Sequence, residues 1–128
     1  MERQNISSGT KWETEVGYSR AVRIGQHVWV AGTTAVDGEG LIIGRGAPEL
    51  QAAFIFQKIG KALLEAGAKL SDVVRTRMYI TNGDYEEAVG RAHAAVFGEI
   101  RPAATMIVVS GLVDSRLLVE IEVDAYIS

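Results

Sequence analysis

The sequence predicts a single α+β domain, with a mixed sheet and two helices packed on one of its faces. Segments with strand-like alternation and segments with helical periodicity are interleaved along the chain in the order ββ(β)αβαββ. Adjacent strands at both ends of the chain are close enough in sequence to form hairpins. A length of 128 residues fits one domain over residues 1–128, in which residues 1–16 are predicted to form a polar, irregular N-terminal arm.

The first predicted elements are two strands joined as a hairpin. Ala21–Ile24 leads through a turn at residues 25–26 into His27–Ala35, which is rich in β-branched and aromatic residues. The glycine-rich segment 37–46 predicts a loop, in which Leu41–Ile43 is a candidate short strand.

Two helices and three further strands follow. Pro48 stands where a first helical residue is favoured, apolar residues recur at helical spacing from Ala52 to Ala66, and Gly67 ends the pattern. A second helix is predicted over Tyr85–Phe97. The remaining strands are predicted over 73–80, 103–109 and 117–127.

The sheet face away from the helices is not predicted to be polar. Trp29, Tyr79, Ile107 and Val109 are scattered over the predicted strands. Helices on one side only would leave this face open to water. The simplest partner to cover it is another copy of the chain, which needs no second kind of protein.

Composition and charge exclude several classes of function. The 13 Lys and Arg against 16 Asp and Glu, net −3, make nucleic acid an unfavoured partner. The absence of cysteine excludes disulfides, thiolate nucleophiles and iron–sulfur ligation. His27 and His93, far apart in the sequence, do not predict a metal site, and His93 is more typical of a packed side chain. No apolar run is long enough to cross a membrane, and we expect a cytoplasmic protein.

Charged residues alternate along two of the predicted strands. Glu120, Glu122 and Asp124 share one face of the last strand, while Arg75 and Arg77 share a face of strand 73–80 with Tyr79. If the strands are neighbours, one interpretation is a structural ladder of ion pairs. The other is a pocket in which a glutamate orients water and an arginine binds a carboxylate through two hydrogen bonds.

The C-terminal third resembles a known family. Residues 101–122 read RPAATMIVVSGLVDSRLLVEIE, and Pro102, Ala103, Thr105, Leu112 and residues 119–122 follow the pattern of the Rid family, also called YjgF/YER057c/UK114. Upstream, the resemblance continues in Tyr18, Ala31-Gly32, Gln51, the stretch 64–67 and Val73–Thr76. It covers residues 18–127.

The resemblance implies a chorismate-mutase-like fold, in which three subunits close their sheets into a barrel with a small-molecule cleft between subunits. It implies cofactor-independent hydrolysis of small enamines and imines to keto acids and ammonia. Glu120 would place the water, Tyr18 would line the cleft, and the backbone at Ala31 and Gly32 would contact the substrate. Thr105 would lie in the same substrate-binding set.

The sequence departs from the family at one position of the site. Ala104 stands where the family carries the arginine that binds the substrate carboxylate, and Arg77 and Arg101 are the candidate replacements. The competing hypotheses are a trimer that binds a small ligand without catalysis and an endoribonuclease or translation inhibitor. The net charge of −3 argues against the last of these.

Overall fold

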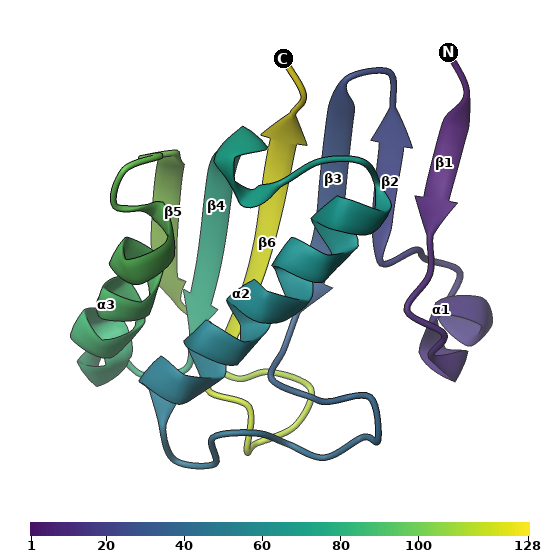
Figure 1. Cartoon of the computed structure of the whole chain (residues 1–128). Coiled ribbons are helices and arrows are strands. Elements are labelled where there is room, and N and C mark those ends of the chain that lie inside the picture. Colours follow the sequence, from purple (N-terminus) through teal and green to yellow (C-terminus); the bar gives the residue numbers. More distant parts are fainter.

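The computed structural model describes all 128 residues. The chain folds into one six-stranded sheet with three α-helices (Figure 1). The strand order is β1-β2-β3-β6-β4-β5, and every neighbouring pair is antiparallel except β4 and β5, which are parallel. The predicted α+β class and mixed sheet are therefore confirmed. The strands are β1 (Arg3–Ile6), β2 (Ala21–Ile24), β3 (His27–Thr33), β4 (Val73–Ile80), β5 (Ala103–Val108) and β6 (Val119–Tyr126). The helices are α1 (Lys11–Val16), α2 (Pro48–Glu65) and α3 (Glu86–Phe97), with 3₁₀ turns at Leu70–Asp72 and Gly83–Tyr85.

The core lies between the sheet and helices α2 and α3, which cover the same face (Figure 1). Helix α2 starts with Pro48 in its first turn and buries a stripe that includes Ile55, Ile59 and Leu63, each 0% exposed. Burying one such side chain contributes about 1.5–3 kcal/mol. The stripe packs over the inward-facing residues of β6, which holds the centre of the sheet in place.

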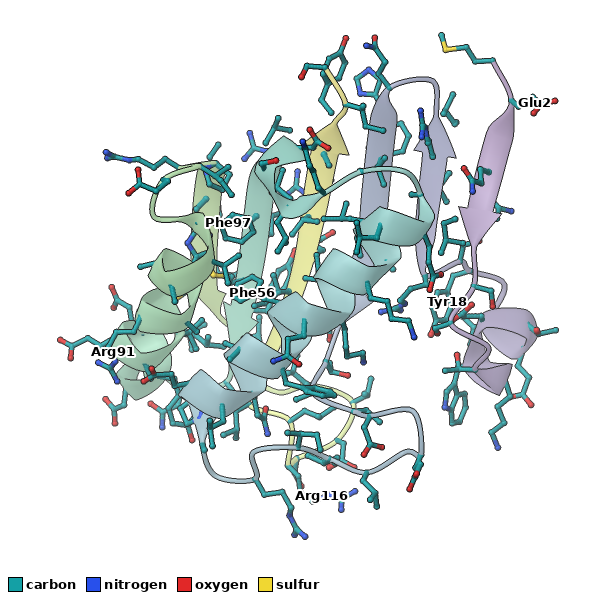
Figure 2. The ribbon with its side chains drawn as sticks, viewed as in Figure 1. Glu2, Tyr18, Phe56, Arg91, Phe97 and Arg116 are labelled. Carbon is teal, nitrogen blue, oxygen red and sulfur yellow. The ribbon has the colours of Figure 1, made fainter.

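Aromatic side chains join the two covering helices. Phe56 of α2 and Phe97 of α3 meet edge to face with ring centroids 5.4 Å apart, and both are buried (Figure 2). Such pairs contribute about 0.5–1.5 kcal/mol beyond their burial. They fix α3 against α2, and both helices lie on the same face of the sheet (Figure 1).

The prediction of an irregular N-terminal arm is wrong. Residues 3–6 form β1, which pairs antiparallel with β2, and Ile6 is buried opposite Ala21. Glu13 of α1 is buried and accepts hydrogen bonds from the Ser8 backbone N–H (3.2 Å) and the Thr10 hydroxyl (3.2 Å). This polar segment therefore folds because the Glu13 carboxylate accepts hydrogen bonds from polar groups of the preceding loop.

Several predicted boundaries also differ from the structure. The candidate strand at Leu41–Ile43 is only an isolated bridge between Val36 and Ile42, because the surrounding turns leave no room for a ladder. β3 ends at Thr33 rather than Ala35, since its pairing with β6 shifts register after Val30. The second helix begins at Glu86, after a 3₁₀ turn that includes Tyr85. No helix of the chain is long and apolar enough to cross a membrane.

Candidate functional site

A hollow lies on the uncovered sheet face at the end where β3, β4 and β5 end and β6 begins. This end of the strands is the lower one in Figure 1. The loops that follow β3 and β5 run beneath this end of the sheet (Figure 1). The hollow has a volume of about 390 Å³. Its polar lining is Gly32, Tyr79, Glu120 and Glu122, and the rest comes from residues 109, 111 and 112.

Glu120 and Gly32 both line this hollow and are in direct contact. A Cβ placed on Gly32 would stand 2.1 Å from Oε2 of Glu120 and 3.1 Å from its Cδ. Only glycine therefore leaves space for the carboxylate where it lies. The register shift of β3 between Val30 and Thr33 brings the Gly32 backbone to this point.

The environment of Glu120 alters its proton affinity. Burial raises the pKa of this carboxyl above its ordinary value, and the neighbouring Glu122 carboxylate raises it further. The positive charge of Arg20 acts in the opposite direction. A carboxylate with a raised pKa in a hollow is suited to exchange protons with a bound molecule.

The charged rows predicted from the sequence face each other across β4 and β6, but a single ion pair forms between them. Arg75, Arg77 and Tyr79 of β4 lie directly opposite Asp124, Glu122 and Glu120 of β6. Nη1 of Arg77 pairs diagonally with Oδ2 of Asp124 at 3.3 Å. The Tyr79 hydroxyl donates a hydrogen bond to Glu122, which raises the pKa of Tyr79. Arg77 and Asp124 therefore form an ion pair, while Tyr79, Glu120 and Glu122 line the hollow.

The cation beside Glu120 is one that the sequence reasoning missed. Arg20 precedes β2, and its Nη1 donates to the Gly32 carbonyl (3.1 Å) and to the Thr33 hydroxyl (3.0 Å). Its guanidinium lies 5.8 Å from the centre of the Tyr18 ring, and Tyr18 is 40% exposed next to α1 (Figure 2). The signal was its place two residues after Tyr18, a residue already predicted to line the cleft.

The predicted binding residues near β5 lie apart from Glu120 in one chain. Ile107 is the β5 residue level with Glu120, through Tyr79. Arg101 lies beyond the other end of β5, about 20 Å away at the rise of an extended strand. Ala104 pairs with Thr76, whose side chain points toward the helices, whereas Thr105 is on the uncovered face, and both are exposed. Glu120, Gly32 and Ala31 form one group, and residues 101–105 form another at the exposed edge.

The histidines lie outside the hollow. His93 of α3 shares a hydrogen bond of 2.9 Å with the buried Thr76 hydroxyl and packs against Phe56 and Phe97. Burial lowers its pKa. His27 stacks on Trp29 at the upper end of the sheet. Neither belongs to a group of three or more residues that could hold a metal ion.

A larger hollow of about 460 Å³ lies at the opposite end of the sheet, beside the C-terminus. Its charged side chains are Lys69 and Asp72, and the Asp72 carboxylate already accepts the Lys69 backbone N–H at 3.0 Å. This chemistry closes a turn, so the hollow around Glu120 is the candidate site.

Comparisons with known proteins agree with this fold. A family model described as Endoribonuclease L-PSP matches residues 9–127. The chain is similar to the crystal structure of a Mycobacterium tuberculosis member of the YjgF/YER057c/UK114 family, with 47% identity, a TM-score of 0.88 and coverage of 98% of this chain and 100% of that one. It is 42% identical over 123 residues to an uncharacterized protein of Streptomyces coelicolor, covering 96% of this chain and 91% of that protein. It is 27% identical to RidA from an Antarctic Psychrobacter, with a TM-score of 0.80 and coverage of 96% and 94%.

The family match spans nearly the whole chain, including β2, β3 and β6, which carry Gly32 and Glu120. The resemblance noticed in residues 18–127 is therefore confirmed, and the chain belongs to the Endoribonuclease L-PSP family, which is the YjgF/YER057c/UK114 or Rid family.

Proposed function

We propose that the protein is a cofactor-independent hydrolase of small imines and enamines, with Glu120 as the base that orients water. The observation that carries this proposal is the contact between the Glu120 carboxylate and the backbone of Gly32 inside a hollow. The raised pKa makes this carboxyl a stronger base than an ordinary glutamate, which supports a role in proton transfer.

The reaction proceeds by addition of water to a carbon–nitrogen double bond. An enamine first becomes its imine by gaining a proton on carbon and losing one from nitrogen. Water then attacks the carbon of the nitrogen-protonated imine while Glu120 accepts a water proton, which gives a neutral carbinolamine. Glu120 returns that proton to the nitrogen, and the carbon–nitrogen bond then breaks as the carbinolamine hydroxyl gives its proton back to Glu120, releasing ammonia and a carbonyl compound.

We propose that the working unit is a homotrimer, in which a neighbouring chain completes the hollow. The uncovered face exposes Trp29 (43%) and Ile107 (46%), and the strand β5 is almost wholly exposed. An edge strand and an apolar face of this kind favour association with another copy. Residues 101–105 of one subunit could then meet Glu120 of another.

The alanine at position 104 sets an expectation for the substrate. A hydrogen bond between charged groups contributes about 1.5–3 kcal/mol, and Ala104 supplies none. We therefore expect weak turnover of small 2-imino acids, whose carboxylate needs such a partner. Ala104→Arg should increase turnover of 2-iminopropanoate, and wild-type rates equal to those of Ala104→Arg would contradict this expectation.

The test of the proposed function uses imines generated in situ by an amino-acid oxidase, with ammonia release as the readout. Wild-type protein should accelerate hydrolysis of these 2-imino acids weakly and Ala104→Arg more strongly, and Glu120→Gln should abolish the acceleration in both while the protein stays folded. If the wild type binds small imines without accelerating their hydrolysis, the protein is a ligand-binding trimer and the hydrolase proposal fails. Nucleic acid remains the unfavoured partner, because the net charge is −3 and two glutamates line the hollow.

A further inference from the structure

Arg20 holds the end of β3 in place through hydrogen bonds to Gly32 and Thr33. Its Nη1 donates to both the Gly32 carbonyl and the Thr33 hydroxyl, and that hydroxyl in turn donates to the Ala31 carbonyl at 2.8 Å. Thr33 is only 1% exposed. One guanidinium nitrogen therefore fixes the three-residue segment that ends β3, at the point where its register with β6 shifts.

This segment is also what Glu120 packs against. Gly32 has the Glu120 carboxylate at its Cα and the Arg20 guanidinium at its carbonyl oxygen. The Nε atom of Arg20 is buried without a hydrogen-bond partner, although buried donors are nearly always satisfied.

We propose that Arg20 is a positioning residue for Glu120, which holds Gly32 against the carboxylate and balances its negative charge. This inference rests on the proposed function, because it assigns Arg20 a role in preparing the base of that reaction. The cation at Arg20 differs in role from the family arginine that Ala104 replaces. The family arginine binds the substrate carboxylate, whereas Arg20 acts on the protein's own carboxylate, Glu120.

The charges around Glu120 leave Arg20 as its compensating cation. Glu122 on the same strand raises the Glu120 pKa, and Tyr79 from β4 directs its hydroxyl to Glu122. Arg77, also on β4, is paired with Asp124 farther along the sheet. Arg20 alone lowers the Glu120 pKa, against the larger effect of burial.

The field of Arg20 also reaches Lys58 of α2 on its other side. Burial and the positive charge of Arg20 lower the pKa of Lys58 to about 8, although Asp37 acts in the opposite direction. Lys58 donates to the Thr34 carbonyl at 2.8 Å, next to the segment that Arg20 holds. The titration of Lys58 therefore gives an independent measure of the same charge.

The experiment compares Arg20→Gln and Arg20→Lys with a matched control, Arg23→Gln. Arg23 also donates to two backbone carbonyls, those of Gly25 (2.9 Å) and Ala66 (2.7 Å), but it does not affect the Glu120 pKa. The full-length protein is labelled with ¹³C at the side-chain carboxyls of glutamate, and the Glu120 resonance is titrated by NMR. Glu120→Gln identifies that resonance.

The proposal expects the Glu120 pKa to rise in Arg20→Gln, to stay close to wild type in Arg20→Lys, and not to change in Arg23→Gln. In Arg20→Gln the Lys58 pKa should rise as well. An unchanged Glu120 pKa in a folded Arg20→Gln protein would overturn the proposal, and so would an equal rise in Arg23→Gln. If Arg20→Gln does not fold, Arg20→Lys tests the positioning role, because an ammonium keeps the charge but cannot reproduce both Nη1 bonds in the same arrangement. The Glu120 pKa should then stay close to wild type while kcat/KM falls, and a shifted pKa or a wild-type kcat/KM would overturn the proposal.

Activity gives a second, separable readout. If imine hydrolysis is present, kcat/KM of Arg20→Gln should fall roughly 10- to 100-fold, and its pH profile should shift upward with the Glu120 pKa. Arg20→Lys should recover part of the lost kcat/KM, and the recovery should not come from a change in KM alone. If the wild type shows no hydrolysis, the proposed function fails, while the NMR titration still decides whether Arg20 controls Glu120.

Discussion

Gly32→Ala tests whether the contact in the hollow matters for function rather than for folding. The new Cβ would stand 2.1 Å from Oε2 of Glu120, whereas ordinary contacts of a Cβ begin near 3.4 Å. The carboxylate oxygen must therefore move by more than an ångström. The atom that must give way is the far end of a flexible side chain, so rotation of Glu120 relieves most of the clash without moving the backbone.

This geometry separates the cost in stability from the cost in activity. Introducing a methyl group into a packed site destabilises a protein by about 1–3 kcal/mol. We expect Gly32→Ala to fall at the lower end of this range, since the displaced group can turn into the hollow. A displacement of about 1 Å at a reacting group can lower the rate by roughly 100-fold, so hydrolysis should be nearly lost.

Urea unfolding and ammonia release measured on the same preparations separate these two effects. Gly38→Ala is the control, because a Cβ at Gly38 meets nothing within 4 Å and its backbone is not left-handed. A Gly32→Ala protein that keeps wild-type activity and an unchanged Glu120 titration would refute the role given to this contact. A loss of 4 kcal/mol or more would instead show that Gly32 is chiefly a packing residue.

Three further predictions follow from the fold. Light scattering should give about 41 kDa, three chains of 13.8 kDa, and a stable 13.8 kDa monomer at micromolar concentration would exclude a shared hollow. Gly90→Ala in α3 should raise the free energy of unfolding by about 0.5–1 kcal/mol, because its Cβ meets nothing within 4 Å; a decrease would show that this surface is covered in the assembly. Burial lowers the His93 pKa below 6.5, so the contribution of neutral His93 to stability is complete above that pH and is lost as the pH falls below it. Urea midpoints at pH 7.5 and 5 should therefore differ less in His93→Gln than in the wild type, and an equal difference in both would contradict this assignment.

Periodicity predicted the elements whose burial follows a simple repeat. The helical stripe from Ala52 to Leu63 and the strict alternation of 119–125 place the core correctly, because each period allows only one face to be buried. The same alternation placed Glu120, Glu122 and Asp124 on one face. Arg77 and Tyr79 were expected to face them only if the two strands were neighbours, and the pairing of β4 with β6 meets that condition.

The N-terminal residues could not be predicted in this way, because their folding does not depend on apolar repeats. β1 contributes a single buried side chain, Ile6, and the turn before α1 depends on hydrogen bonds to the buried Glu13. Burial opposes ionisation of this carboxyl, but the hydrogen bonds from Ser8, Ser7 and Thr10 together lower its pKa. No local pattern of hydrophobicity reveals that a carboxylate will accept hydrogen bonds from the loop that precedes it.

The candidate site residues were predicted by two different signals. Alternation placed Glu120 on one strand face with Glu122 and Asp124, and the family resemblance singled out Glu120 among them, as it did Gly32. Arg20 has neither property: its importance comes from two hydrogen bonds across twelve residues and a register shift in β3 that no repeat encodes. A cation sought only on the strands beside Glu120 leads to Arg77, whose partner is Asp124. For a carboxylate proposed as catalytic, such as Glu120, the balancing cation is therefore better sought among the groups that hold the backbone it packs against than among its neighbours along the sheet.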